Sequence, residues 1–227
     1  MLKLVLFDFD GVIADSEPAH YEIFRQVCFE EGIDLSWAVY EQRYLGYTDQ
    51  ECFYHVYKDN NRVIRAEIID DLCQRKKILF AEYIKGQEIL LPGVREILIQ
   101  LRDAGITCSI CSGALKSEVE FILDNAGLRE FFTCIVAAED VEHGKPHPEG
   151  YELALKLTNK AINADPAITT EECIVIEDSL WGIQAGHAAG IKCLGLATTY
   201  QPNALAVAEH VVKNLSEASV SLLQSMV

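Results

Sequence analysis

Short apolar runs alternate with helical patterns along most of the chain, and polar or turn-forming residues bound each run. A continuous apolar run is typical of a strand buried on both faces, as in a parallel sheet covered by helices. Strands that alternate with helices favour an α/β fold, and right-handed crossovers make it a doubly wound parallel sheet. The five runs are Leu4–Phe7, Thr107–Cys111, Cys134–Ala137, Cys173–Ile176 and Cys193–Leu196.

A helical pattern precedes each of the later four runs. The first pattern ends at Gly105 and the second at Gly127, because glycine suits the backbone that ends a helix. In the second pattern, Ser117 and Glu120 have the spacing of a capping box, which predicts a helix start there. The four patterns cover residues 92–105, 116–127, 148–160 and 179–190.

The stretch from residue 16 to residue 88 breaks this alternation, because three helical patterns follow one another there. The first begins near Pro18 and ends at Gly32. The second begins at a capping box of Thr48 and Glu51, and the third covers residues 63–86. An all-helical insertion after the first strand predicts a cap domain.

We therefore predict two domains in this chain. Residues 1–15 and 89–227 would form the α/β catalytic core, and residues 16–88 would form the helical cap. In an open α/β sheet, ligands bind beyond the carboxyl ends of the strands. The functional residues are therefore expected where the strands of the core end.

Composition narrows the range of partners. The chain has 227 residues and a net charge of −16, which argues against nucleic acid and an anionic membrane because both attract basic surfaces. No apolar stretch is long enough for a membrane span, and no secretory signal is evident. Eight cysteines without such a signal predict reduced thiols and a cytoplasmic protein. We find no sequence feature that indicates a protein partner.

Asp8 and Asp10 lie in and beside the end of the first strand. Residues two apart in a strand point the same way, so two anions would face one side and raise each other's pKa. A carboxylate within an apolar run also costs free energy unless it is paired. A cation must therefore stabilise this arrangement.

The ends of the other strands supply further polar residues. The second run is followed by Ser112 and Gly113, the third leads to Lys145, and the fourth ends at Glu177 and Asp178. Taken singly, a serine or an acid there could be a helix cap, and a lysine could be a solvated surface charge. Their placement along one edge of one sheet is what predicts a site.

A hard cation explains the cluster of acids best. Asp8, Asp10 and Asp178 suit Mg²⁺, which prefers a few carboxylates, water and substrate phosphate as ligands. Two other spacings have simpler interpretations. Cys108 and Cys111 are three apart in a strand, so they face opposite sides and are expected to be buried thiols. His143 and His147 are separated by Gly144 and Pro146, so the helical spacing of zinc-binding histidines does not apply.

The segments "DFDGVIADSE", "CSGA", "HGKPHPEGY" and "IEDSLWGIQAGHAAG" resemble the four motifs of the haloacid dehalogenase-like hydrolase superfamily. The resemblance covers essentially the whole chain. It is strongest to the subfamily whose helical cap lies between the first and second motifs. That branch includes phosphoglycolate phosphatase and beta-phosphoglucomutase, and its core is Rossmann-like.

The resemblance implies roles for the core residues. Asp8 would be the nucleophile that accepts the phosphoryl group, and Asp10 would be the general acid and then the base. Ser112 would bind a phosphate oxygen, and Lys145 would screen the negative charges. The neighbouring Gly11 would let the chain turn past the phosphate.

The resemblance also implies a metal site and a substrate site. Asp8, Asp10 and Asp178, with Glu177 in support, would hold Mg²⁺. Gly113 next to the serine would approach the phosphate, and specificity would lie in the cap. The cap candidates are His20, Arg43, Tyr44, Tyr47 and Thr48.

These observations predict a Mg²⁺-dependent phosphatase that hydrolyses a small phosphorylated metabolite through an aspartyl-phosphate. One alternative is a sugar-phosphate mutase of the beta-phosphoglucomutase type, which needs a cap cation for its second phosphate. Asp49 occupies the matching position, although Arg43 lies nearby. A second alternative, of another class, is a catalytically silent phosphate-binding regulatory protein.

Overall fold

The computed structural model describes residues 1–45, 47–85, 87 and 89–227. The chain forms two compact units, one of Met1–Asp15 and Ile89–Val227 and the other of Ser16–Glu88. Among the described residues, no helix has both the length and the apolar character that a membrane span requires. Gly86 and Glu88, the predicted ends of the third helix and of the helical domain, lie outside the described residues.

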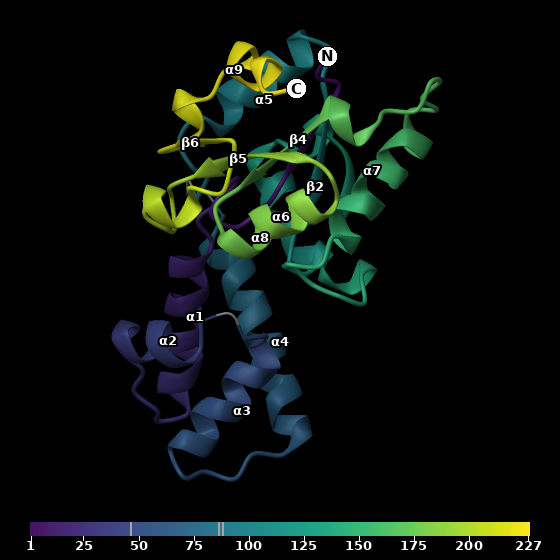
Figure 1. Cartoon of the computed structure of the whole chain (residues 1–227). Coiled ribbons are helices and arrows are strands. Elements are labelled where there is room, and N and C mark those ends of the chain that lie inside the picture. Colours follow the sequence, from purple (N-terminus) through teal and green to yellow (C-terminus); the bar gives the residue numbers. More distant parts are fainter. Residues whose placement is uncertain (46, 86, 88) are drawn as a thin grey trace. The chain divides into compact units, whose positions relative to one another are not determined.

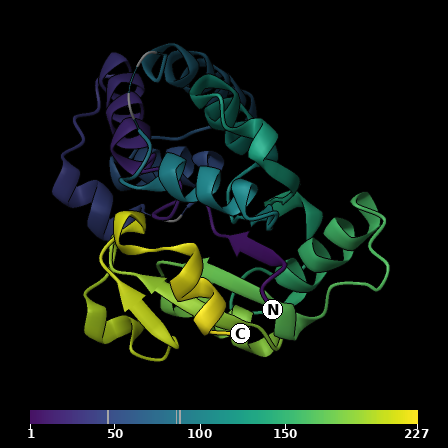
Figure 2. The ribbon, with the colours of Figure 1, turned by 90° about the horizontal axis from the view of Figure 1, so that it is seen from above.

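The larger unit is built on a six-stranded parallel sheet with the order β3-β2-β1-β4-β5-β6. The first strand lies inside the sheet, between a strand on either side (Figures 1 and 2). The predicted α/β class and parallel sheet are confirmed. The strands are β1 (Leu4–Phe7), β2 (Thr107–Cys111), β3 (Phe132–Val136), β4 (Cys173–Glu177), β5 (Lys192–Leu196) and β6 (His210–Val212).

The sixth strand was not predicted. Strand β6 has three residues, and its first, His210, is exposed, so it presents no apolar run. It is an edge strand that pairs with β5 through Leu194 and His210, among other pairs. A short polar edge strand is formed by its tertiary neighbour rather than by its own pattern.

Helices and 3₁₀ turns connect these strands. The helices of the larger unit are α5 (Val94–Asp103), α6 (Lys116–Ala126), α7 (Glu149–Ala161), α8 (Leu180–Ala188) and α9 (Val220–Ser225). The 3₁₀ turns are Arg129–Phe131, Ala138–Asp140, Thr170–Glu172, Pro202–Leu205 and Leu215–Glu217. The first four of these helices match the predicted segments.

The predicted capping box of α6 is wrong. The N-cap is Leu115, so Ser117 lies inside the first turn, and no side chain caps the helix from that position. Instead, the backbone N–H of Lys116 donates to the carboxylate of Glu139, at 3.1 Å. An acid distant in sequence therefore satisfies the helix N-terminus, where a negative charge is favourable.

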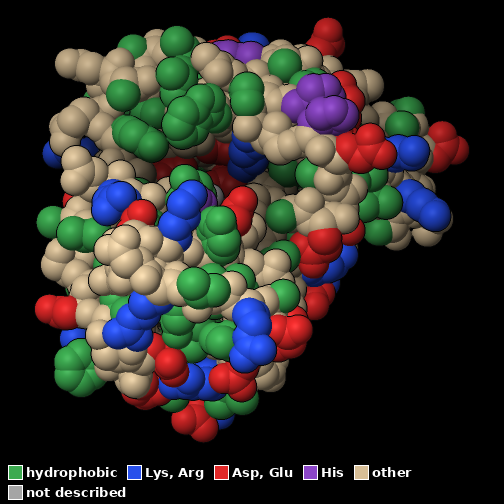
Figure 3. Space-filling view, turned by 90° about the horizontal axis from the view of Figure 1, so that it is seen from below, with side chains coloured by type: hydrophobic (Ala, Val, Ile, Leu, Met, Phe, Trp, Pro, Cys, Tyr) green, Lys and Arg blue, Asp and Glu red, His purple; other side chains and the backbone are tan. Residues whose placement is uncertain are grey.

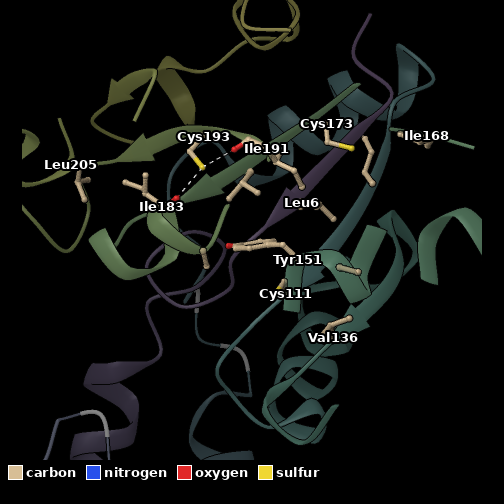
Figure 4. Packing of buried hydrophobic residues seen from close by; sticks show 14 residues of the cluster. Leu6, Cys111, Val136, Tyr151, Ile168, Cys173, Ile183, Ile191, Cys193 and Leu205 are labelled. Atoms are coloured by element: carbon tan, nitrogen blue, oxygen red, sulfur yellow. Dashed lines mark hydrogen bonds between the residues drawn. The ribbon is translucent and has the colours of Figure 1, made fainter. Parts of the chain in front are cut away.

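A buried cluster joins the sheet to α7 and α8 (Figure 4). Leu6 from the first strand, Val175 from the fourth and Tyr151 from α7 are almost fully buried in it. Burying each large apolar side chain contributes about 1.5–3 kcal/mol. Cys193 lies in the same cluster, and its thiol contacts the carbonyl oxygens of Ile183 and Ile191 at 3.6 Å each. This packing fixes the helices that flank the strand ends.

The smaller unit is all helical, as predicted, and has its own core. Its helices are α1 (Glu17–Glu30), α2 (Trp37–Arg43), α3 (Asp49–Asp59) and α4 (Ala66–Tyr83). The capping box of Thr48 and Glu51 at the start of α3 is confirmed. The rings of Phe24 and Phe53 stack with centroids 4.3 Å apart in this core. Helix α2 was not predicted, because its seven residues are too few to show a clear period.

Candidate active site

The register of the sheet brings three strand ends level. Phe7 of β1 pairs with Ile110 of β2 and with Ile176 of β4. The backbone N–H of Asp8 continues this pairing by donating to the carbonyl of Ile176, at 2.9 Å. Asp8 and Glu177 are consequently neighbours on adjacent strands, as the ends of parallel strands should be.

Lys145 connects these strand ends. Its Nζ lies 2.5 Å from Oδ1 of Asp8 and 2.6 Å from Oε1 of Glu177. It also donates to the carbonyl of Cys111 at the end of β2, at 3.1 Å. The lysine side chain is mostly buried, so the solvated surface charge considered from the sequence is excluded. One cation therefore holds groups from three strands together.

Glu177 is fully buried and has a complete set of partners. Tyr151 donates its hydroxyl to Oε1 of Glu177 at 2.7 Å, and Ser179 donates its hydroxyl to Oε2 at 2.9 Å. The ring of Tyr151 also lies 5.2 Å below Nζ of Lys145. Glu177 thus orients the lysine, while Tyr151 and Ser179 orient Glu177.

Three buried acids face one another across this site. Asp8, Glu177 and Asp178 each offer a carboxylate oxygen within 4.8 Å of the other two. Burial, with the charges of Glu177 and Asp178, raises the pKa of Asp8 well above its usual value despite Lys145. Burial also raises the pKa of Asp178 to about 6, against a hydrogen bond from Thr199.

The same charges act on Lys145 in the opposite sense. Burial alone would lower the pKa of Lys145, but Asp8 and Glu177 outweigh burial and raise it above its usual value. The lysine is therefore charged at any physiological pH. One ammonium group faces three carboxyl groups, so it offsets only part of the repulsion between them. A second cation at this site would reduce the remaining repulsion. An acidic group able to hold a metal is consequently present where the sequence predicted it.

Glycines make this crowding possible. Gly11 follows the first strand with φ of +74°, and a Cβ there would lie 2.0 Å from Oδ2 of Asp178. The backbone conformation and the space both favour glycine. Gly182 on α8 is equally restricted, because a Cβ there would lie 1.8 Å from Cδ and Oε1 of Glu177.

Gly182→Ala should therefore disturb Glu177 and, through it, Lys145. In a helix interior, replacing glycine by alanine ordinarily raises the free energy of unfolding by about 1 kcal/mol. Here the clash with Glu177 should instead lower it by about 1–3 kcal/mol. We expect a lower melting temperature and a lower kcat. Thermal unfolding and turnover of Gln184→Ala, at an exposed position of the same helix, provide the control. Wild-type stability together with full turnover in Gly182→Ala would contradict this account.

The remaining predicted core residues lie at the same edge. Oγ of Ser112 accepts a hydrogen bond from the backbone N–H of Ala114 at 2.9 Å, which closes a tight turn after β2. Ser112, Gly113 and Lys145 line a pocket of about 280 Å³. Asp10 is half-buried in the turn after β1, where it forms a backbone bridge with Ala14. Among the described residues, Asp10 is not part of the group of acids within 4.8 Å.

The predicted residues of the helical unit have partners within that unit. Arg43 forms an ion pair with Asp59 at 3.0 Å. The ring of Tyr47 stacks on His55, with centroids 4.9 Å apart. Thr48 is the N-cap of α3. Tyr44, another candidate, is buried, and its hydroxyl donates to Asp59 at 2.8 Å.

A buried lysine, which sequence reasoning missed, organises the other half of the helical unit. Nζ of Lys76 contacts Nδ1 of His20 at 2.9 Å and forms an ion pair with Asp49. The His20 ring stacks on Phe80 with centroids 4.2 Å apart. Burial, and then the charge of Lys76, lower the pKa of His20 well below its usual value. His20 is therefore neutral.

A sequence model of the haloacid dehalogenase-like hydrolases matches residues 2–190. The chain is a haloacid dehalogenase-like hydrolase. The family predicted from the four motifs is therefore confirmed, and the four motif segments supply Asp8, Ser112, Lys145 and Glu177 of the site described above.

Individual relatives of this hydrolase agree in length and class. The chain is 29% identical over 217 residues to validoxylamine A 7'-phosphate phosphatase from Streptomyces hygroscopicus subsp. limoneus, covering 96% of both chains. It is 25% identical to the crystal structure of CbbY from Rhodobacter sphaeroides in complex with phosphate, with a TM-score of 0.75 and 96% of each chain covered. The prediction of a phosphatase in this hydrolase family is supported by the name of the first relative.

A third likeness concerns the fold. The crystal structure of beta-phosphoglucomutase from Clostridium difficile covers 100% of this hydrolase, and 97% of that chain is covered in turn. The TM-score is 0.78 and the identity 23%. The predicted Rossmann-like core with an inserted helical domain is thus a shared architecture. At this identity the likeness shows the fold alone.

Proposed function

We propose that the chain is a Mg²⁺-dependent phosphatase of small phosphomonoesters that works through a phosphorylated Asp8. The observation that carries the proposal is the pairing of Asp8 with Lys145, at 2.5 Å, beside a pocket lined by Ser112. A carboxylate at a strand end, a fixed cation and a hydroxyl are the groups that phosphoryl transfer requires.

The acids fit a magnesium ion. Asp8, Glu177 and Asp178 are buried and lie close together, and Lys145 balances one charge. A hard, small cation with carboxylate ligands relieves the remaining repulsion. Asp8 and Asp178 of this group, with Glu177 in support, are the proposed ligands, and Asp10, whose carboxylate lies outside the group, is retained as the further ligand that the sequence predicted. When bound, Mg²⁺ supplies charge neutralisation for the phosphoryl group.

The proposed reaction has two steps. A carboxylate oxygen of Asp8 attacks phosphorus, the bond from phosphorus to the ester oxygen breaks, and Asp10 gives its proton to the leaving alkoxide. Asp10 then takes a proton from water, the water oxygen attacks phosphorus, and the bond to Asp8 breaks to release phosphate. Lys145 stabilises the negative charge throughout, and Ser112 donates a hydrogen bond to a phosphate oxygen.

The substrate class follows from the relatives and from the size of the site. One relative is named as a phosphatase of validoxylamine A 7'-phosphate, and CbbY was solved with phosphate. We propose a small phosphorylated metabolite as the substrate. We propose that the helical unit selects it as a cap, with His20, Arg43, Tyr47 and Thr48 as the candidate residues.

The eight cysteines are free thiols, which supports the cytoplasmic localisation predicted from the sequence.

Hydrolysis is favoured over mutase activity by the ion pairs of the helical unit. A mutase must hold a second phosphate with a cation. Arg43 is already paired with Asp59, and Lys76 is paired with Asp49. Each of these cations has a carboxylate partner that would compete with, and repel, a second phosphate.

Two measurements on one sample test this proposal. Phosphate release from sugar phosphates and phosphoglycolate with Mg²⁺ should show turnover, and phosphorus NMR on glucose 1-phosphate should show inorganic phosphate as the product. Efficient formation of glucose 6-phosphate that depends on a bisphosphate primer would instead establish the mutase. Absence of turnover on every ester, with phosphate still bound, would favour the silent regulatory protein.

A further inference from the structure

Two exposed histidines flank the lysine of the site. His143 and His147 lie on the loop between the 3₁₀ turn Ala138–Asp140 and helix α7, and Lys145 stands between them in sequence. Their rings are 4.7 Å apart between centroids. Histidine side chains are seen gathered at the surface in Figure 3. The two imidazole rings are brought together by the turn of this loop. The regular spacing of a helix plays no part, because neither histidine lies in one.

Glu149, at the start of α7, completes the group. Oε2 of Glu149 lies 3.0 Å from Nδ1 of His143 and 3.8 Å from Nδ1 of His147. One ligand atom from each of the three residues lies within 4.8 Å of the other two. A single ion between them could therefore contact all three side chains after small rotations.

The backbone already orients two of these side chains. Oε1 of Glu149 accepts a hydrogen bond from the backbone N–H of Glu142 at 2.9 Å, and Oε2 accepts one from that of His143 at 3.1 Å. Nδ1 of His147 accepts a hydrogen bond from the backbone N–H of Glu149 at 3.3 Å, which holds the ring beside the carboxylate and is replaced when Nδ1 binds the ion. The two bonds to the Glu149 carboxylate are outer bonds of the kind that fix the direction of a ligand before the metal arrives.

The donor set indicates the class of metal. Two imidazole nitrogens and one carboxylate oxygen suit Zn²⁺ and similar borderline ions, whereas Mg²⁺ prefers oxygen ligands alone. The side chains of His143 and His147 are 62% and 52% exposed, so an ion can reach them from solvent. Three protein ligands leave a fourth tetrahedral position for water.

We propose that His143, His147 and Glu149 form a Zn²⁺ site separate from the acid cluster of Asp8, Glu177 and Asp178. Zn²⁺ there joins the two flanks of Lys145 to the start of α7, and so restrains the loop that carries the lysine. This site uses none of the proposed catalytic residues as ligands, so it stands whether or not the proposed function does.

A calorimetric titration with Zn²⁺ tests the site. The protein is first stripped of metal, and a large excess of Mg²⁺ is then added to compete for the carboxylate cluster. The wild type should bind one Zn²⁺ per chain under these conditions, and the variant H143A/H147A should bind it at least ~100-fold more weakly because two ligands are gone. His187→Ala is the matched control, since His187 is also exposed and pairs with a glutamate, Glu209, at 3.2 Å.

A second measurement needs no variant. In nitrogen NMR of the wild-type imidazoles, Zn²⁺ should shift the ring signals of His143 and His147 and leave that of His187 in place. Hydrogen exchange of the backbone amides from 142 to 149 should slow in the same titration. Equal zinc affinity in the wild type and the double variant, or unmoved ring signals of His143 and His147, would overturn the proposal.

Discussion

Asp8→Asn is expected to abolish phosphate release while the protein stays folded. An amide cannot attack phosphorus, and removal of a covalent nucleophile ordinarily costs on the order of 10⁴-fold or more in turnover. The fold should tolerate the change, because burial and the neighbouring acids already make the charge of Asp8 unfavourable. Lys145 would keep its ion pair with Glu177. The measurement is kcat for the best ester found, together with the melting temperature.

Asp103→Asn is a suitable control for this prediction. Asp103 is exposed and pairs with its neighbour Arg102, so the same chemical change there should leave kcat unchanged. Turnover in purified Asp8→Asn within tenfold of the wild type, after contamination and deamidation are excluded by mass spectrometry, would show that another group attacks phosphorus. A large fall in the melting temperature of Asp8→Asn would instead assign Asp8 a structural role.

Removal of divalent cations should stop turnover almost completely. Metal stabilisation of phosphoryl charge is worth several kcal/mol, so the loss should be on the order of 10³-fold. Addition of Mg²⁺ should restore the rate, and Ca²⁺ should restore it poorly. Ca²⁺ takes more ligands at longer distances, which would displace the Asp8 carboxylate from the position of attack. The check is the rate of phosphate release after chelation and after each ion is returned.

The Ca²⁺ arm of this experiment is informative in itself. If Ca²⁺ occupies the acids without supporting turnover, it should also inhibit in competition with Mg²⁺. Circular dichroism before and after chelation provides the structural control. The spectrum should stay the same, because the ion neutralises charge at the site and is not needed to form the sheet. A full rate in excess chelator would remove the metal from the proposed mechanism and leave Lys145 as the cation of the site.

Much of the core could be predicted because its signals are local. The five apolar runs correspond to strands β1 to β5, and the acids, serine and lysine that follow them lie at one sheet edge. Parallel topology alone explains this, since strand ends in such a sheet must meet. Cys108 and Cys111 are buried free thiols, as their strand spacing predicted.

The rest depended on contacts that no local pattern carries. Tyr151 reads as one apolar position of a helix, and its bond to Glu177 arises only when α7 packs on the sheet. Lys76 reads as a surface charge in "QRKK", yet it is buried beside His20. Ser117 has the spacing of a capping residue, but the carboxylate of Glu139 accepts the hydrogen bond at the start of α6 instead.

The position of the first strand affects the order in which the protein can assemble. Leu4 pairs across the sheet with Thr107 and with Cys173, both of which lie more than a hundred residues later in the sequence. A strand that must wait for such distant partners has a high contact order, which slows folding and prolongs exposure of apolar segments. The "LVLF" segment therefore has no strand partner in this sheet until Thr107–Cys111 has been synthesised. The helical unit is continuous in sequence and has no such delay built into its connectivity.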